Sequence, residues 1–328
     1  MNKKSGALLT LICANFCANV GADVFAQDAY PVKPIRLVVP YAPGGPTDVM
    51  ARLLGQKWME RWGPPVIVDN RAGGNGVIGA EYVARAPADG YTLLLGNTSV
   101  LTINPAVYAK LPYDADKQFA PVTLSVAAPL ILVVHPSLSV NNVVQLIALA
   151  KSKVRAATLT YASAGTGGVA NMSGELLKFM AKIDMVHVPY KGAGPAVTDL
   201  VSGQVAMTFT STVSVMPLVK SGRLRGLAVT TAKRAPSLPD IPAIAETVPG
   251  YDVSPWYGVL APAGTPAGVI QKLYAETVRI VAAPDVVQRL SLDGGSVVNS
   301  TPEEFARVLR EERTKWSRVV KAAGIRVE

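Results

Sequence analysis

Short apolar runs alternate with amphipathic stretches along most of this chain. The apolar runs predict strands at residues 35–39, 66–68, 92–95, 130–134, 158–161, 185–188, 206–209, 227–230 and 258–261. Helical periodicity predicts helices that include residues 49–61, 143–151, 171–182 and 196–201. Nearly continuous apolar strands that alternate with helices are typical of an α/β fold with largely parallel sheets, covered on both faces.

The end of the chain predicts two further helices. Thr265-Pro266 precedes a helical pattern that runs to about Ala282. A capping box, Thr301-Pro-Glu-Glu304, opens the second helix. Its apolar residues share one face and are assigned to the core: Phe305, Val308, Leu309, Trp316, Val319 and Val320.

A glycine loop follows the first predicted strand. Residues 35–39 lead into Gly44-Gly45, Pro46 opens a helical pattern, and Asp48 lies in the first turn. The first N–H groups of a helix lack intrahelical partners and the helix dipole adds positive charge, so such a tip attracts anions. An ordinary βα turn would produce the same pattern. Glycine here would let a ligand approach the main chain closely.

A similar loop recurs about 120 residues later. Residues 162–168 lie between a predicted strand and a predicted helix, and a third turn at residues 189–194 repeats the arrangement. The groups suited to hold a carboxylate or phosphate are Ser163, Thr166 and the amides of Gly165, Gly167 and Gly168. The spacing does not match a dinucleotide-binding GxGxxG fingerprint, which also requires an acidic residue about 20 positions further on.

The N-terminus has the pattern of a secretory signal peptide. Lys3 and Lys4 precede an apolar run at residues 7–20, and small residues at 24–26 form a cleavage site before Gln27. We therefore expect residues 1–26 to be removed and the protein to enter the periplasm. Because Cys13 and Cys17 both lie in this segment, disulfides, zinc–thiolate sites and cysteine nucleophiles are excluded from the mature chain.

Composition and charge favour a globular protein that binds small acids. The 328 residues are 49% hydrophobic and 17% charged, a length for which two lobes are expected. The formal net charge of +9 suits anionic partners, but the basic residues are scattered without aromatic residues between them. Nucleic-acid binding is therefore disfavoured.

No catalytic constellation, metal site or cofactor motif is expected. The two histidines, His135 and His187, have no partners at ligand spacing and are assigned structural roles. Ser163 lacks the leading glycine of a nucleophile elbow. Hydrolysis is therefore disfavoured.

Several short motifs follow one another along the chain in a specific order. They include Pro40-Tyr-Ala-Pro-Gly-Gly45 with Asp48, Val68-Asp-Asn-Arg71 with Gly73 and Gly74, Ala88-Asp-Gly-Tyr-Thr-Leu93, Tyr161 with Ser163, Gly165 and Gly168, Val188-Pro-Tyr-Lys-Gly192, and Ala261-Pro-Ala-Gly-Thr-Pro266. Together they resemble the Bug family of periplasmic solute receptors, which serve tripartite tricarboxylate transporters.

The resemblance implies a type II-like periplasmic binding protein, with two α/β lobes, a hinge and ligand in the cleft between the lobes. The first lobe would comprise residues 27–128 and 253–328, and the second residues 129–252. Ligand contacts implied for the first lobe are Tyr41, Ala42, Gly44, Gly45, Thr47, Asp48, Asn97 and Thr98. Those implied for the second are Ser163, Thr166, Gly167, Gly168, Tyr190, Lys191 and Thr210.

Three positions qualify this resemblance. Asp48 is an unusual neighbour for an anion, and we expect it to bind loop amides or to orient water. Asn171 stands where many relatives have histidine. Residues 210–212 (Thr-Ser-Thr) lack the acidic or amide residue of many relatives, which disfavours amino-acid ligands.

The expected function is a non-enzymatic receptor that delivers a small di- or tricarboxylate, or an aromatic acid, to the membrane subunits of a transporter. The same receptor signalling to a membrane sensor kinase fits the sequence equally. An enzyme that uses the glycine loops for a nucleotide or phosphorylated substrate is the rival from another class. The signal peptide and the missing catalytic residues argue against it.

Overall fold

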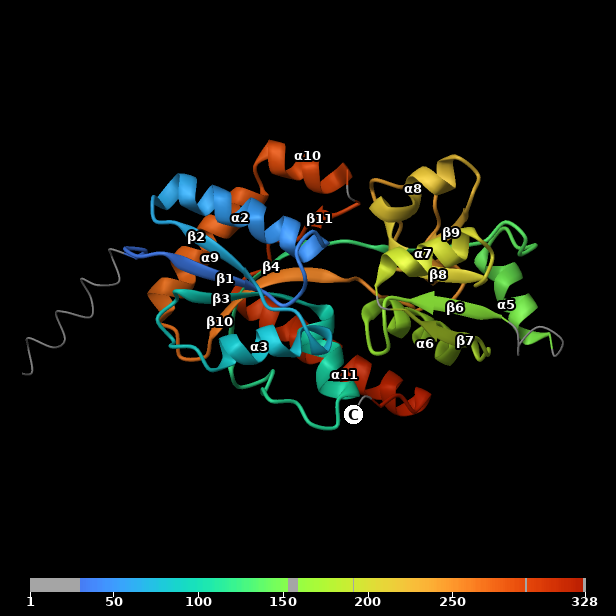
Figure 1. Cartoon of the computed structure of the whole chain (residues 1–328), viewed down its shortest axis with the longest axis horizontal. Helices are drawn as coiled ribbons and strands as arrows, with labels where there is room; N and C mark the ends of the chain where they lie inside the picture. The colour runs from blue at the N-terminus through green and yellow to red at the C-terminus, as the bar shows by residue number, and fades with distance from the viewer. Residues whose placement is uncertain (1–29, 153–158, 191, 293, 327–328) are drawn as a thin grey trace, which may run out of the picture.

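The computed structural model describes residues 30–152, 159–190, 192–292 and 294–326. The predicted signal peptide, the candidate contact Lys191 and the start of the strand expected at 158–161 lie outside the described residues. Two groups of strands and helices lie side by side, each around its own sheet (Figure 1). We call them the first and second lobes, as the fold prediction expected.

The first lobe is built on a six-stranded sheet in the order β11-β4-β10-β3-β1-β2. Its strands are β1 (Ile35–Val39), β2 (Val66–Asn70), β3 (Thr92–Asn97), β4 (Phe119–Ala127), β10 (Trp256–Pro262) and β11 (Ser296–Val297). The first three strands are parallel, whereas β10 is antiparallel to both β3 and β4. β4 was not predicted, because Pro121 and two buried hydroxyl residues, Thr123 and Ser125, interrupt its apolar pattern.

The second lobe has a five-stranded sheet in the order β7-β6-β8-β5-β9. Its strands are β5 (Leu130–Val134), β6 (Thr160–Ser163), β7 (Val186–Pro189), β8 (Met207–Ser211) and β9 (Arg225–Val229). β6 is parallel to β7 and β8, but β5 is antiparallel to β8 and β9. The sheets are therefore mixed rather than largely parallel. The chain enters the second lobe through β5 and returns to the first through β10. Each of these strands is antiparallel to both of its neighbours in the sheet named above.

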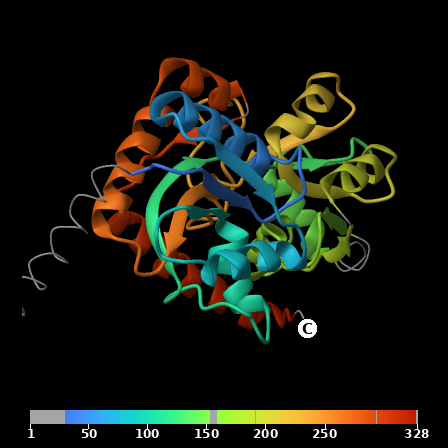
Figure 2. The same ribbon diagram turned by 60° about the vertical axis from the view of Figure 1, so that its left-hand side comes forward.

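Helices cover both faces of the first sheet (Figures 1 and 2). The helices are α2 (Pro46–Trp62), α3 (Val77–Ala84), α4 (Asn104–Val107), α5 (Val143–Lys151), α6 (Val169–Ala181), α7 (Ala193–Val201), α8 (Thr212–Lys220), α9 (Ala267–Val281), α10 (Pro284–Leu292) and α11 (Pro302–Ala323), with short turns η1 (Gly74–Gly76), η2 (Ser99–Ile103) and η4 (Ile244–Glu246). One apolar cluster joins β1 and β3 to α2 and α9, and another joins the opposite face to α3 and α11. Within the described residues, no helix is both long and apolar enough to cross a membrane.

Two adjacent segments carry the chain between the lobes. β4 ends at Ala127 and β5 begins at Leu130, so the outward crossing is only two residues long. The return crossing precedes β10, and the two meet where Ala128 N donates to Pro255 O at 2.8 Å. A paired crossing of this kind is the natural place for the predicted hinge.

Helix α11 packs on both lobes. Phe305 and Leu309 lie in the core of the first lobe, and Phe305 meets Trp256 edge to face at 5.0 Å. Trp316 and Val320 instead lie in an apolar cluster that joins the core of the second lobe to Ile103 and Val107 of the first. The prediction grouped residues 253–328 with the first lobe, yet the last turns of this helix contact the other one (Figure 1).

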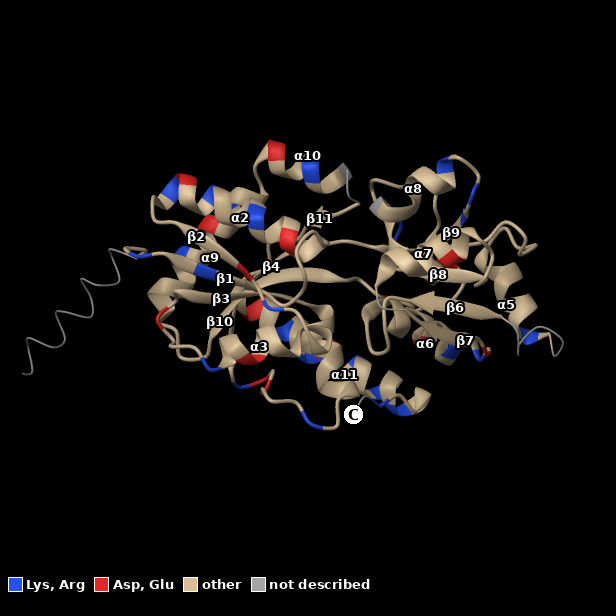
Figure 3. Cartoon of the chain, viewed as in Figure 1, with Lys and Arg blue, Asp and Glu red and all other residues tan. Residues whose placement is uncertain are grey.

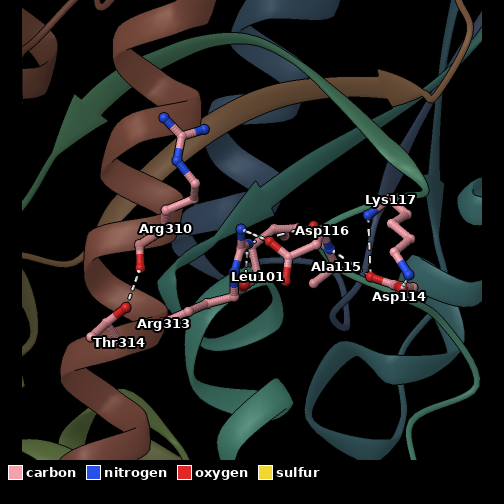
Figure 4. Close-up of polar contacts among 8 residues, drawn as sticks. All are labelled: Leu101, Asp114, Ala115, Asp116, Lys117, Arg310, Arg313 and Thr314. Carbon is pink, nitrogen blue, oxygen red and sulfur yellow. Dashed lines mark hydrogen bonds and ion pairs between the residues drawn. The ribbon is translucent and has the colours of Figure 1, made fainter.

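The middle of α11 is fixed to the first lobe by two charged side chains. Arg313 donates to the carbonyls of Leu101 and Ala115, both at 3.4 Å, and pairs with Asp116 (Figure 4). Glu312 accepts from Trp256 Nε1 at 2.9 Å and from Thr102 Oγ1 at 3.1 Å, and burial raises the pKa of its carboxyl. α11 is thereby anchored beside η2, the short π-helix that follows β3.

We predict that Trp316→Ala destabilises the protein strongly, since its side chain is fully buried in the cluster that joins the two lobes. Loss of a buried tryptophan costs about 3–5 kcal/mol. Arg318→Ala, an exposed position two residues further along α11, should change the free energy of unfolding by no more than about 0.5 kcal/mol. Urea unfolding of both variants measures this, and equal midpoints would show that α11 does not hold the second lobe.

Candidate functional site

Two loops with the same backbone path precede α2 and α6. Gly44 and Gly167 both have positive φ angles, 86° and 75°. The next residue in each loop is the helix N-cap, and Gly45 and Gly168 have φ/ψ of −80°/169° and −75°/161°. Each lobe therefore presents the same helix-start structure.

In both loops the first glycine N–H is bound by the side chain four residues further on. Gly44 N donates to Asp48 Oδ2 at 2.9 Å, and Gly167 N donates to Asn171 Oδ1 at 3.0 Å. These two N–H groups are used within their own loops. The N–H groups that remain for an anion are those of the first helical turn, which lack intrahelical acceptors.

Asp48 organises the loop of the first lobe. Its side chain is buried, and besides Gly44 it accepts from Arg52 Nε and from Asn70 Nδ2, both at 2.9 Å. Asn70 also donates to the Tyr41 carbonyl at 3.1 Å, which ties β2 to the loop. The hydrogen bond from Arg52 contributes most to lowering the pKa of Asp48, to about 2. The expected role of Asp48 in binding a loop amide agrees with this geometry.

Asn171 has the corresponding place in the second lobe, without a charge. It is 2% exposed, and its Nδ2 donates to the Tyr161 hydroxyl at 2.7 Å. Tyr161 in turn donates to Glu175 Oε1 at 2.5 Å, and burial raises the pKa of this phenol. The loop of the second lobe is therefore held by a neutral amide connected to a buried network.

Ser163 and His187 form a pair that the sequence did not reveal. Ser163 Oγ lies 2.7 Å from His187 Nε2 and donates to the Gly165 carbonyl at 2.9 Å. If the one hydroxyl proton goes to Gly165, the imidazole donates to Ser163 through Nε2. Burial lowers the pKa of His187, which favours the neutral ring. The pair connects the loop of the second lobe to β7, and the structural role of His187 stays a prediction.

Four other candidates carry polar groups without a partner among the described residues. Thr47 and Thr210 are buried residues whose hydroxyls make no hydrogen bond there. Asn97 accepts from Tyr41 and Val100 through Oδ1, so its amide N–H groups stay available. The Thr98 hydroxyl accepts from Trp256 N at 3.0 Å and retains its proton. These groups are donors suited to an acid.

The remaining candidates are placed differently. Ala42 and Thr166 are exposed, and the Tyr190 hydroxyl donates to Asp199 at 2.7 Å. Tyr41 is a neutral phenol at ordinary pH, because burial raises its pKa to about 12. Asn70 was missed, since only the pairing of β2 with β1 brings it to Asp48.

Charged residues do not concentrate at these loops. Lys and Arg are spread over both lobes, with acidic residues between them (Figure 3). Within the described residues, no group of three or more His, Cys, Asp or Glu side chains is placed to hold a metal ion.

The two lobes, their paired crossings and their matched helix starts define a two-lobed α/β solute-binding receptor. A family model described as tripartite tricarboxylate transporter family receptor, TctC, matches residues 50–325. The chain belongs to this family, and the Bug resemblance is confirmed.

Named relatives and solved structures resemble nearly the whole chain. A UPF0065 protein from the tcbD-tcbE intergenic region of Pseudomonas sp. is 40% identical over 89% of this chain and 87% of its own length. Protein BugT of Bordetella pertussis is 36% identical over 95% of both chains. A structure of R. palustris Rpa4515 with adipate has a TM-score of 0.81 and 37% identity, covering 90% of this chain and 99% of its own. MatC from Rhodopseudomonas palustris with bound malate has a TM-score of 0.78 and 34% identity, covering 89% of this chain and 100% of its own.

We predict that Asp48→Asn destabilises the protein by about 2 kcal/mol at pH 7, because hydrogen bonds to Gly44 and Arg52 lose a charged acceptor. Asp48 has a folded pKa of about 2, below its ordinary value of 3.8. Its contribution is therefore complete above about pH 4 and disappears as the pH falls to about 2.

The measurement is the difference in unfolding free energy between wild type and variant across pH 2–7. Asp285→Asn is the matched control, because Asp285 also lies in a first helical turn but forms an exposed pair with Lys57. That change should cost much less than Asp48→Asn, because solvent screens the exposed pair. If the difference in unfolding free energy between wild type and Asp48→Asn does not decrease below pH 4, the stabilisation does not come from the charged Asp48 carboxylate.

Proposed function

We propose that this receptor captures a small dicarboxylate between its lobes and delivers it to the membrane subunits of a tripartite tricarboxylate transporter. The lobes would be residues 27–128 with 253–328, and residues 129–252, in a protein exported after removal of residues 1–26. The matched helix starts at Gly45 and Gly168 support this most strongly, because each lobe offers an anion main-chain N–H groups at a helix start, although Pro46 supplies none at the first position of α2.

The size of each interaction favours two loops over one. A helix N-terminus stabilises an anion by about 0.3–2 kcal/mol. Hydrogen bonds to a charged group add about 1.5–3 kcal/mol each. Micromolar binding requires about −8 kcal/mol. Contacts from both lobes reach this sum, and a ligand that touches both lobes binds the closed state better than the open one.

The available donors favour an acid over an amino acid. Thr47, Asn97, Thr98 and Thr210 are neutral, and residues 210–212 supply no carboxylate for an ammonium group. The adipate and malate in the related structures are both dicarboxylates, which supports the same ligand class here. No step of covalent chemistry is needed.

A thermal-shift panel tests the ligand class. Adipate, malate, an aromatic acid, aspartate and ATP should be compared on the purified protein. A dicarboxylate at a hundred times its dissociation constant should add about 2.7 kcal/mol of stability, whereas ATP should add none. Stabilisation by ATP alone would contradict the proposal and favour the nucleotide-using enzyme.

Gly45→Ala and Gly168→Ala test the contact with the loops. Both residues have ordinary negative φ, and an added Cβ would lie no closer than 3.9 Å and 3.4 Å to the atoms around it, so each variant should fold normally. The methyl group would occupy space that a bound carboxylate needs. We expect each change to weaken binding of the stabilising acid at least tenfold.

Arg318→Ala is the control, since Arg318 is exposed on α11 and belongs to neither glycine loop. Isothermal titration calorimetry measures the three affinities. Wild-type affinity in both loop variants would show that the acid does not approach either N-cap.

A further inference from the structure

A side chain from the first lobe makes a hydrogen bond to the glycine loop of the second. Asn75, in η1, directs its Nδ2 to the carbonyl oxygen of Gly167 at 3.4 Å. Ninety-two residues separate the two in sequence, and they belong to different lobes. This contact joins two protein groups directly.

Asn75 is held in place for this contact. Its backbone has a φ of 52°, in the left-handed region that asparagine tolerates better than most residues. Nδ2 also donates to Asn104 Oδ1 at 2.9 Å, while Asn104 Nδ2 returns a bond to the Asn75 carbonyl at 3.0 Å. Asn104 is fully buried, so this reciprocal pair fixes both the backbone and the amide plane of Asn75.

The segment that carries Asn75 also packs against the glycine loop of the first lobe. A Cβ added to Gly76 would lie 3.2 Å from Pro40 Cβ and 3.4 Å from the Tyr41 hydroxyl. Tyr108 fixes the other side through a 3.0 Å hydrogen bond to the Gly74 carbonyl. The η1 turn therefore touches one candidate ligand loop by packing and the other by a hydrogen bond.

The acceptor is equally constrained. Gly167 is the residue whose N–H is bound by Asn171, and its φ of 75° is part of the loop conformation that both lobes share. Opening of the lobes would leave the carbonyl to water and the Asn75 amide with one partner fewer. Such a change has little cost in water, so the bond is a weak, reversible connection.

We propose that Asn75 is a latch that stabilises the closed arrangement of the ligand-free receptor by bonding to the Gly167 carbonyl. This proposal rests on the proposed function in one respect, that closure of the lobes serves to capture a ligand. Asn75 acts as a positioning residue: it sets the distance between the two glycine loops before an acid arrives. A larger closed population raises the apparent affinity for any ligand that needs both loops.

Asn75→Gly removes the amide while allowing the same positive φ. Asn75→Asp keeps the size and the backbone preference but cannot donate to Gly167. Asn299→Gly is the matched control, because Asn299 has nearly the same φ, 51°, and follows β11 at a distance from both loops in the sequence. These variants separate the loss of the donor from the greater freedom of a glycine backbone.

The closed and open populations can be measured without ligand by double electron–electron resonance. Nitroxide labels on Ile67→Cys in the first lobe and Val144→Cys in the second occupy exposed positions, and expression without residues 1–26 removes Cys13 and Cys17. We expect both Asn75 variants to lower the ratio of closed to open protein roughly two- to tenfold, the range for one neutral hydrogen bond. Asn299→Gly should keep the wild-type ratio.

Three outcomes would overturn the latch: Asn75 variants with the wild-type distance distribution, an equal shift in Asn299→Gly, or a wild-type protein with no closed population. None of these depends on the identity of the ligand. Addition of adipate or malate to the labelled wild type tests the proposed function separately. If an acid closes the lobes but the Asn75 variants behave as wild type, the receptor proposal is supported and only the latch is rejected.

Discussion

The arrangement depends on one local interaction that occurs twice, a helix-start glycine whose N–H is bound by the side chain four residues later. Without Asp48 and Asn171, the left-handed glycines Gly44 and Gly167 would belong to flexible loops. With these bonds, the N-cap residues have the same conformation in both lobes. Rigid donors lose little conformational freedom when an anion binds, so the entropic cost of ordering the site is small.

The two copies of this interaction differ in charge, and that difference has consequences. Asp48 is negative but is offset by Arg52, whereas Asn171 is neutral and leads to Tyr161 and Glu175. Neither loop thus brings a net positive side chain to the anion. Binding then depends on oriented N–H groups and hydroxyls, and such donors retain their strength over a wide range of pH.

Much of the fold could be predicted from the sequence. The apolar runs gave the first and fifth strands, Ile35–Val39 and Leu130–Val134, with their true bounds, because apolar residues fill both except at Arg36. β4 could not be predicted, since buried hydroxyl residues interrupt its apolar pattern, and Thr123 finds its partner, the Ser300 carbonyl, far along the chain. The double packing of α11 was also hidden, because a helical stripe does not reveal which core each part meets.

The candidate site was predictable only in part, because contacts between residues far apart in the sequence are not visible in it. Glycines before a helix indicate an anion-binding loop locally, and the family resemblance supplied their pairing. Asn70 and Asn75 are ordinary polar residues in the sequence, and only strand pairing and the approach of the lobes give them partners. Their roles belong to tertiary structure.

The most direct test is a crystal structure of the protein with the dicarboxylate that stabilises it best. We predict carboxylate oxygens within hydrogen-bonding distance of first-turn N–H groups from both α2 and α6, directly or through one water molecule. An acid held by one lobe alone, or bound away from Gly45 and Gly168, would contradict the central claim.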